Sequence, residues 1–314
     1  MIVKREFDPR RVVPYVQREL AIAAGASLVA LALVEWAGIS EAALPFGLAP
    51  VLGTALAIFL AFRNNASAAR WNEGAALWAG ISSYSRVFAR LIVTFTASHR
   101  HTPQFDAVRA EGFQQEMVRR QIAWVHMLRL QLRGQDTAAG DAAGYLPPHD
   151  RAEAQRRHNP AAWLLQRQGQ RIYDAMADGT LQGFDSFQLE GCLLQLSVLQ
   201  GNCERLKMIP ALRQYGYFTR IFSQLFIVLL PFCLIGALAP GSQRWLVVPL
   251  TMLVAFVFAI IERVGAVNED PFENRIQDVP LTAYSRAIER DLLATLGERD
   301  LPPAHTPTAD GYLA

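Results

Sequence analysis

Three side chains in the second apolar stretch have types and a spacing that suit a constriction. Thr54, Ile58 and Phe62 are four residues apart, so they share one face of an α-helix. Repeated around an axis, such side chains would form rings that block or admit ions by narrowing and dewetting. An ordinary membrane helix with a chance stripe of bulky residues has the same spacing, so periodicity alone leaves both interpretations open.

The helix that carries these residues must be long. No helix breaker lies between Thr54 and Trp71, so we expect one helix that begins in lipid and ends in water. Its second face holds the small residues Gly53, Ala57 and Ala61, which allow another helix to come close. We expect Arg63 and Arg70 on the same helix to be interface anchors that snorkel toward water.

Residues with reactive chemistry are sparse. The sequence has no P-loop, no GxGxxG and no HExxH motif, and its few histidines are scattered. We expect His126 to be a structural hydrogen-bonding residue. The three cysteines lack CxxC spacing, so we expect them to be reduced packing residues; they are Cys192, Cys203 and Cys233. The pattern predicts no enzyme, no cofactor and no metal site, and the net charge of +2 predicts no nucleic-acid partner.

Hydropathy divides the 314 residues, of which 52% are apolar, into four spans and polar connections. The first span is somewhat short for a bilayer, but Trp36 and Ile39 extend it to the interface. The apolar cores of the spans lack Asp, Glu, Lys, Arg and His, which an ion-coupled carrier usually needs. The spans are expected at Leu20–Trp36, Pro45–Phe62, Ile221–Ala239 and Trp245–Ile261. A passive pore needs only side chains that line an axis, so it is the simplest interpretation. The alternatives are a membrane transporter and a non-conducting membrane scaffold.

The charge distribution sets the expected topology. Lys and Arg precede the first span and follow the second but are absent from the hairpin between them, which predicts both termini in the cytoplasm. The chain is therefore divided into a cytoplasmic N-terminal segment (1–19), a transmembrane hairpin (20–62), a helical cytoplasmic region (63–220), a second transmembrane hairpin (221–262), a cytoplasmic C-terminal region (263–300) and a disordered Pro-rich tail (301–314).

Polar regions of the chain show helical and no strand periodicity. Amphipathic helices are expected over Gln114–Leu132, Pro160–Met176, Ser186–Met208 and Leu281–Leu296. Asn159 precedes Pro160 and is suited to cap the second of these helices. The fold class is thus an all-α membrane protein with four transmembrane helices and a helical cytoplasmic bundle.

Four sequence stretches resemble the bestrophin family of ion channels, in consistent order up to about Leu296. They are FRNNASAARWNEG (62–74), WVHMLRLQLR (124–133), NPAAWLL (159–165) and NEDPFENRIQDVPL (268–281). The chain is most similar to prokaryotic members. The resemblance implies a homopentamer around one axial pore in the cell inner membrane, passing monovalent ions through an apolar neck.

The resemblance also assigns positions. Counted back from Arg70-Trp71, the family neck falls on Thr54, Ile58 and Phe62, and Thr54 departs from members that are apolar at all three positions. A lower constriction is expected near the start of the helix that leads to Cys203, with Leu181 and Phe187 as candidates.

Selectivity stays open at this point, because eukaryotic relatives pass chloride and some prokaryotic relatives favour cations. Glu41 at the outer mouth would favour cations, whereas the electropositive ring edges of Phe62 would favour anions. Eukaryotic relatives also have a calcium clasp, but here only Glu273 and Asp278 follow the Pro-Phe pair. Calcium needs roughly six to eight oxygens, so no activating calcium site is expected. Glu269 and Asp270 are expected to cap or pair structurally.

Overall fold

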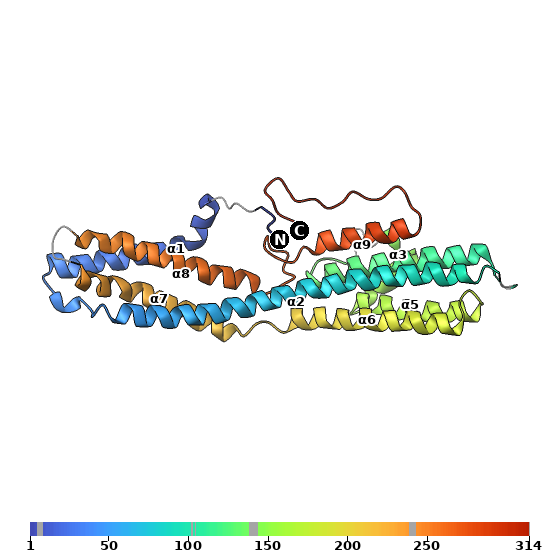
Figure 1. Ribbon diagram of the computed structural model, residues 1–314, viewed down its shortest axis with the longest axis horizontal. Helices are drawn as coiled ribbons and strands as arrows, with labels where there is room; N and C mark the ends of the chain where they lie inside the picture. Colours follow the sequence, from blue (N-terminus) through green and yellow to red (C-terminus); the bar gives the residue numbers. More distant parts are fainter. Residues whose placement is uncertain (5–8, 102, 104, 138–143, 239–242, 314) are drawn as a thin grey trace. The chain divides into compact units, whose positions relative to one another are not determined.

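The computed structural model describes all residues except 5–8, 102, 104, 138–143, 239–242 and 314 (Figure 1). The link at residues 240–242 and part of the basic N-terminal segment therefore lie outside the described residues. The described part contains helices and one isolated bridge between Ile2 and Tyr312, but no strand. It forms two compact units, which we call the span unit (Lys4–Trp71 and Pro210–Asp270) and the bundle unit (Met1–Val3, Asn72–Ile209 and Pro271–Ala314).

The span unit contains the apolar helices. Four helices are long and apolar enough to cross a membrane, which confirms the number of spans predicted from hydropathy. Helices α1, α7 and α8 pack against one another, and α2 joins them through side chains. The elements are α1 (Pro9–Leu31), the π-helical turn η1 (Ala32–Trp36), η2 (Ser40–Ala42), the first part of α2 (Leu48–Ser98), α7 (Arg213–Ala237), η4 (Arg244–Leu246) and α8 (Val247–Asn268).

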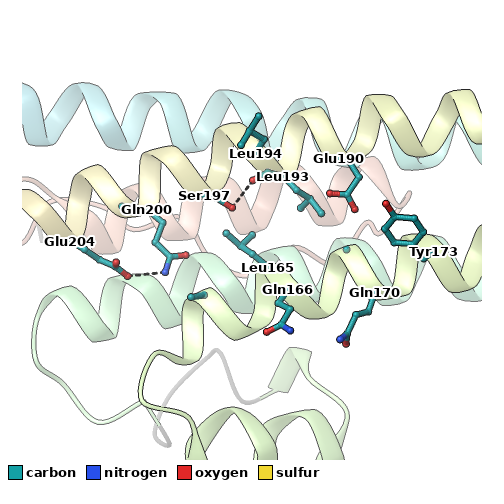
Figure 2. A pocket seen from close by; sticks show the side chains of 13 residues that line it. Leu165, Gln166, Gln170, Tyr173, Glu190, Leu193, Leu194, Ser197, Gln200 and Glu204 are labelled. Carbon is teal, nitrogen blue, oxygen red and sulfur yellow. Dashed lines mark hydrogen bonds between the residues drawn. The ribbon is translucent and has the colours of Figure 1, made fainter.

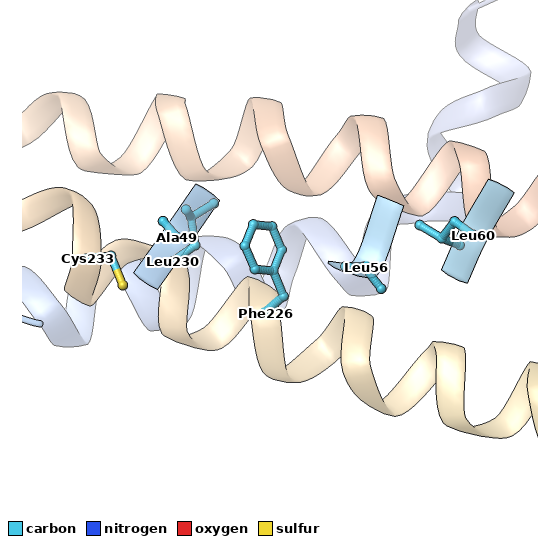
Figure 3. Packing of buried hydrophobic residues seen from close by; sticks show 6 residues of the cluster. All are labelled: Ala49, Leu56, Leu60, Phe226, Leu230 and Cys233. Atoms are coloured by element: carbon cyan, nitrogen blue, oxygen red, sulfur yellow. The ribbon is translucent and has the colours of Figure 1, made fainter. Parts of the chain in front are cut away.

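One face of α2 packs on α7. Side chains from both helices form a buried cluster (Figure 3), whose members are Ala49, Leu56, Leu60, Phe226, Leu230 and Cys233. Gly53 lies on this face, where an added Cβ would approach Phe226 Cζ to 3.2 Å. The predicted close approach of another helix is therefore seen at Gly53, whereas Ala57 and Ala61 are exposed in the single chain.

Helix α2 is continuous for 51 residues, as expected from the lack of a helix breaker between Thr54 and Trp71. Residues 48–71 belong to the span unit and residues 72–98 to the bundle unit. In the bundle unit, this helix buries Trp78, Ile81, Phe88 and Ile92 along one stripe.

Amphipathic helices build the rest of the bundle unit: α3 (Ala107–Leu132), α4 (Pro148–Arg156), α5 (Pro160–Ala177), α6 (Gly183–Met208) and α9 (Leu281–Thr295). The Asn159 side chain accepts a hydrogen bond from Ala162 N at 3.0 Å, which confirms the predicted cap. Trp124 is fully buried and donates from Nε1 to Gln200 at 3.0 Å, so the core satisfies its polar atoms with side-chain amides.

The C-terminal tail differs from the expected disorder. Val3 N donates to Gly311 O at 2.9 Å, and Leu313 N donates to Met1 O at 2.8 Å. Arg290 also donates to Pro302 O. These hydrogen bonds attach the tail to the bundle unit, and Leu301, Pro302, Tyr312 and Leu313 are partly buried there.

Candidate functional site

The three candidate neck residues lie on the face of α2 that their own chain leaves uncovered. Thr54 is exposed, and Ile58 and Phe62 are 51% and 71% exposed, against 3% for Leu56 and 1% for Leu60. At roughly 100° per residue, the exposed set lies on the opposite side of the helix from the packed set. These side chains must therefore meet something outside the single chain.

A buried ion-pair cluster fixes the rotation of α2 directly after Phe62. Arg63 binds Glu262 Oε1 through Nη1 at 2.9 Å and Glu269 Oε2 through Nη2 at 3.0 Å, and its side chain is 8% exposed. The expectation that Arg63 snorkels to the interface is wrong, because two carboxylates at the end of α8 hold its guanidinium inside the span unit. Gly216 permits this placement, since a Cβ there would come within 3.1 Å of Arg63 Nη2.

Two further contacts extend this attachment of α2. Arg70 Nε donates to the backbone oxygen of Glu269 at 2.9 Å, so Arg70 also binds protein rather than snorkelling. Asn64 Nδ2 donates to Ile261 O at 3.0 Å. A Cβ on Gly265 would lie only 2.0 Å from Asn64 Oδ1, so a side chain at position 265 would displace the Asn64 amide from this contact.

Each acidic side chain after α8 has a partner of its own. In the span unit, Glu269 binds Arg63 at 3.0 Å and Asp270 binds Arg213 at 3.5 Å, which confirms that both pair structurally. In the bundle unit, Glu273 binds Lys207 at 2.6 Å. The described residues contain no group of three or more His, Cys, Asp or Glu that could hold a metal ion.

Asp278 stabilises an unusual turn. Its carboxylate accepts hydrogen bonds from the backbone N–H groups of Phe272 (2.9 Å), Asn274 (2.9 Å) and Val279 (2.7 Å). Phe272 and Asn274 have φ values of +75° and +58°, a region that side chains other than glycine adopt at a cost. The role of Asp278 is thus to hold this turn, in which Phe272 is fully buried.

The two candidates for the lower constriction differ in exposure. Leu181 is 2% exposed and its N–H donates to Ala175 O at 2.9 Å, so it closes the end of α5 and cannot line an opening. Phe187, in the first turns of α6, is 75% exposed. Gly179, with φ of +81°, lies in the turn that leads to the buried Leu181, whereas Phe187 lies on the uncovered face of α6.

Helix α6 carries an exposed stripe that the sequence reasoning missed. Its members recur at alternating spacings of three and four residues, as in a coiled-coil seam, and all are exposed: Phe184, Phe187, Gly191, Leu194, Val198, Gly201, Arg205 and Met208. We call this set the α6 stripe. The spacing is visible in the sequence, but the buried face of α6 has a similar period and masks it.

A groove of about 620 Å³ lies between α5 and α6 and shares Leu194 and Gly201 with the α6 stripe. Figure 2 shows Glu190 and Tyr173 at one end of the groove and Gln200 and Glu204 at the other. Burial raises the pKa of Glu190. The Ser197 hydroxyl in the groove donates to Leu193 O at 2.9 Å rather than to either glutamate.

The structure shows the surroundings of Glu41, of His126 and of the three cysteines. Glu41 lies exposed in η2, on the same hairpin as Glu35, which binds Arg244 at 2.8 Å. His126 Nε2 lies 3.0 Å from the buried Glu289 Oε2, as expected of a structural histidine. Burial raises the pKa of Cys203 to about 12, and the three cysteines are free and buried, which confirms them as packing residues.

Four apolar helices, joined to a bundle of amphipathic helices with a conspicuous exposed stripe, define an all-α membrane protein. The sequence matches the family described as "Bacterial/Fungal Bestrophin protein" over residues 8–294, and the chain belongs to this family of ion channels.

Named relatives and a solved structure agree with this assignment. The chain is 31% identical over 278 residues to the "Voltage-dependent anion channel-forming protein YneE" of Escherichia coli K12, covering 88% of this chain and 85% of the relative. It is also 31% identical to the protein of the same name from Salmonella typhi, over 83% of this chain and 81% of the relative. The crystal structure of a bacterial bestrophin homologue from Klebsiella pneumoniae matches with a TM-score of 0.80 at 26% identity, covering 90% of this chain and 99% of that chain.

Proposed function

We propose that five copies of this chain surround one axial pore and that the assembly conducts monovalent ions passively. The observation that carries the proposal is the exposed face of α2, where Thr54, Ile58 and Phe62 lie opposite the packed Leu56 and Leu60. A helix with one covered and one uncovered apolar face suits a position between its own subunit and a shared axis.

The α6 stripe supports self-association independently. Leu194, Val198 and Met208 are exposed at heptad-like spacing on α6, and burial of such a face against another helix is favourable. A second copy of the same chain supplies one. The number five comes from the family resemblance.

In this arrangement, rings of Ile58 and Phe62 form a neck that admits ions only when it is wide enough to stay wet. Phe187 forms the lower constriction. Thr54 makes the outer end of the neck more polar than the inner end.

We infer that the permeant ions are anions. The named relatives are called anion channel-forming proteins, and the exposed Phe62 rings would present electropositive edges to an ion in the neck. Glu41 at the outer mouth opposes this preference weakly, because an exposed carboxylate is screened by salt.

The proposed location is the cell inner membrane, with both termini cytoplasmic. Lys4 and Arg18 precede the first span, whereas the hairpin ends on the other side carry Arg244, which Glu35 neutralises. This asymmetry follows the positive-inside rule.

The proposal is tested by the mass of the purified protein in detergent and by its reversal potential in a planar bilayer with asymmetric NaCl. A pentamer with single-channel steps and a reversal potential of the sign set by chloride is expected. Saturable uptake without steps would indicate a coupled carrier, and no flux would indicate a scaffold. A reversal potential of the opposite sign would refute anion selectivity alone.

A further inference from the structure

Arginines at one end of the spans fall into two groups. Arg63 is buried between two glutamates. In contrast, Arg18, Arg220 and Arg263 are exposed and form no ion pair with any residue that the structure describes. Each of these three lies within two residues of the end of an apolar span. The fold therefore leaves the positive charges of these three arginines without a described carboxylate partner at this end of the spans.

Tyr15 orients one of these cations. The guanidinium carbon of Arg263 on α8 lies 5.3 Å from the centroid of the Tyr15 ring on α1. A stacked guanidinium keeps its in-plane N–H donors available at its edge. Arg18 follows Tyr15 by three residues on α1 and so lies on the same face. The neighbouring Glu19 forms no ion pair in the described part of the chain, so it does not compete for these donors.

Apolar surface continues from this point along α1. Leu28 and Val29 are 60% and 52% exposed and follow Arg18 by about three helical turns, so they lie on the same side of α1 as Arg18. The site thus combines two cations at the end of the spans with a surface for an acyl chain. A phospholipid with an anionic headgroup has both complementary parts, whereas a soluble anion would use only the cations.

We propose that Tyr15, Arg18 and Arg263 bind the headgroup phosphate of an anionic phospholipid. Arginine donates paired, charge-assisted hydrogen bonds to phosphate oxygens in a geometry that lysine does not match. Each arginine near an anionic membrane surface contributes on the order of fivefold in affinity, so removing both should weaken binding about 25-fold. The inference requires the chain to sit in a bilayer, but it does not depend on conduction or on five-fold assembly.

Native mass spectrometry of the purified full chain tests the site. Wild-type protein is mixed with phosphatidylglycerol or phosphatidylcholine in detergent, and bound lipid is counted at matched concentrations. The double variant R18Q/R263Q should lose the tight phosphatidylglycerol adduct and keep weak phosphatidylcholine adducts. R244Q is the matched control, because Arg244 is an arginine at the other end of α8 that Glu35 already pairs, and it should bind lipid as the wild type does.

Two further measurements distinguish binding of a whole phospholipid from binding of a soluble anion or from a simple charge effect. Glycerol phosphate, which has the phosphate without acyl chains, should not displace the bound lipid; displacement would mean that the cations alone form a soluble-anion site. R18K/R263K keeps the charge and should retain only part of the preference. Equal phosphatidylglycerol binding by wild type and R18Q/R263Q, or an equal loss in R244Q, would overturn the proposal whatever currents the protein carries.

Discussion

Replacing Ile58 and Phe62 together by alanine is the sharpest perturbation of the proposed neck. Both side chains are largely exposed within their own chain, at 51% and 71%. The matched control replaces Leu56 and Leu60, which lie on the same helix turns but are 3% and 1% exposed. The two double variants remove apolar side chains from opposite faces of α2.

The expected stability costs differ because burial differs. A fully buried Phe or Ile costs roughly 2–5 kcal/mol when truncated to alanine. Only about three-tenths of Phe62 and half of Ile58 is covered by the chain, so the neck variant should lose about 2–4 kcal/mol within the subunit. The Leu56 and Leu60 control should lose about 4–10 kcal/mol, since both residues are buried in the contact with α7.

Single-channel recording in planar bilayers is the assay, with pentamer mass measured on the same samples. A neck barrier lowered by about 1.4 kcal/mol raises the conductance about tenfold, and we expect a rise of this order for I58A/F62A. The control should reduce the yield of folded protein without changing unit conductance. Wild-type conductance in an intact I58A/F62A assembly, or an equal rise in L56A/L60A, would refute the assignment of the neck to this face.

Three further predictions concern the polar contacts. Arg63→Gln leaves Glu262 and Glu269 as buried carboxylates without their cation, so thermal unfolding in detergent should show a loss of about 3–5 kcal/mol, and an unchanged melting temperature would contradict the clamp. Burial raises the pKa of Glu190 in the folded chain, so folding is favoured below that pKa and weakened as pH rises through it; Glu190→Gln should therefore raise the melting temperature at pH 8 but not at pH 4. Asp278→Ala removes three backbone hydrogen bonds and should cost about 2–4 kcal/mol in denaturant unfolding followed by circular dichroism, whereas a cost below 1 kcal/mol would show that the turn is held by other contacts.

Local sequence patterns predicted the helices well, but they failed for residues whose partners lie far away in the sequence. The spans and the Asn159 cap depend on residues close in sequence, so composition and spacing identify them. Arg63 and Glu262 are 199 positions apart, and nothing in the local sequence of Arg63 distinguishes a buried clamp from an interface anchor. Leu181 and Phe187 are both apolar near the start of α6, but Leu181 is buried in the turn after α5 whereas Phe187 lies on the uncovered face of α6.

The clamp at Arg63 also explains how the orientation of the proposed neck is set. The apolar cluster between α2 and α7 could tolerate a modest rotation, because its members are interchangeable in kind. Turning α2 by one position, roughly 100°, would withdraw Arg63 from Glu262 and Glu269 and leave buried charges unpaired, at a cost of several kcal/mol. Phe62 immediately precedes Arg63, so the direction of its side chain is fixed within each subunit. In the proposed assembly, the copies would then come together around the axis that this face lines.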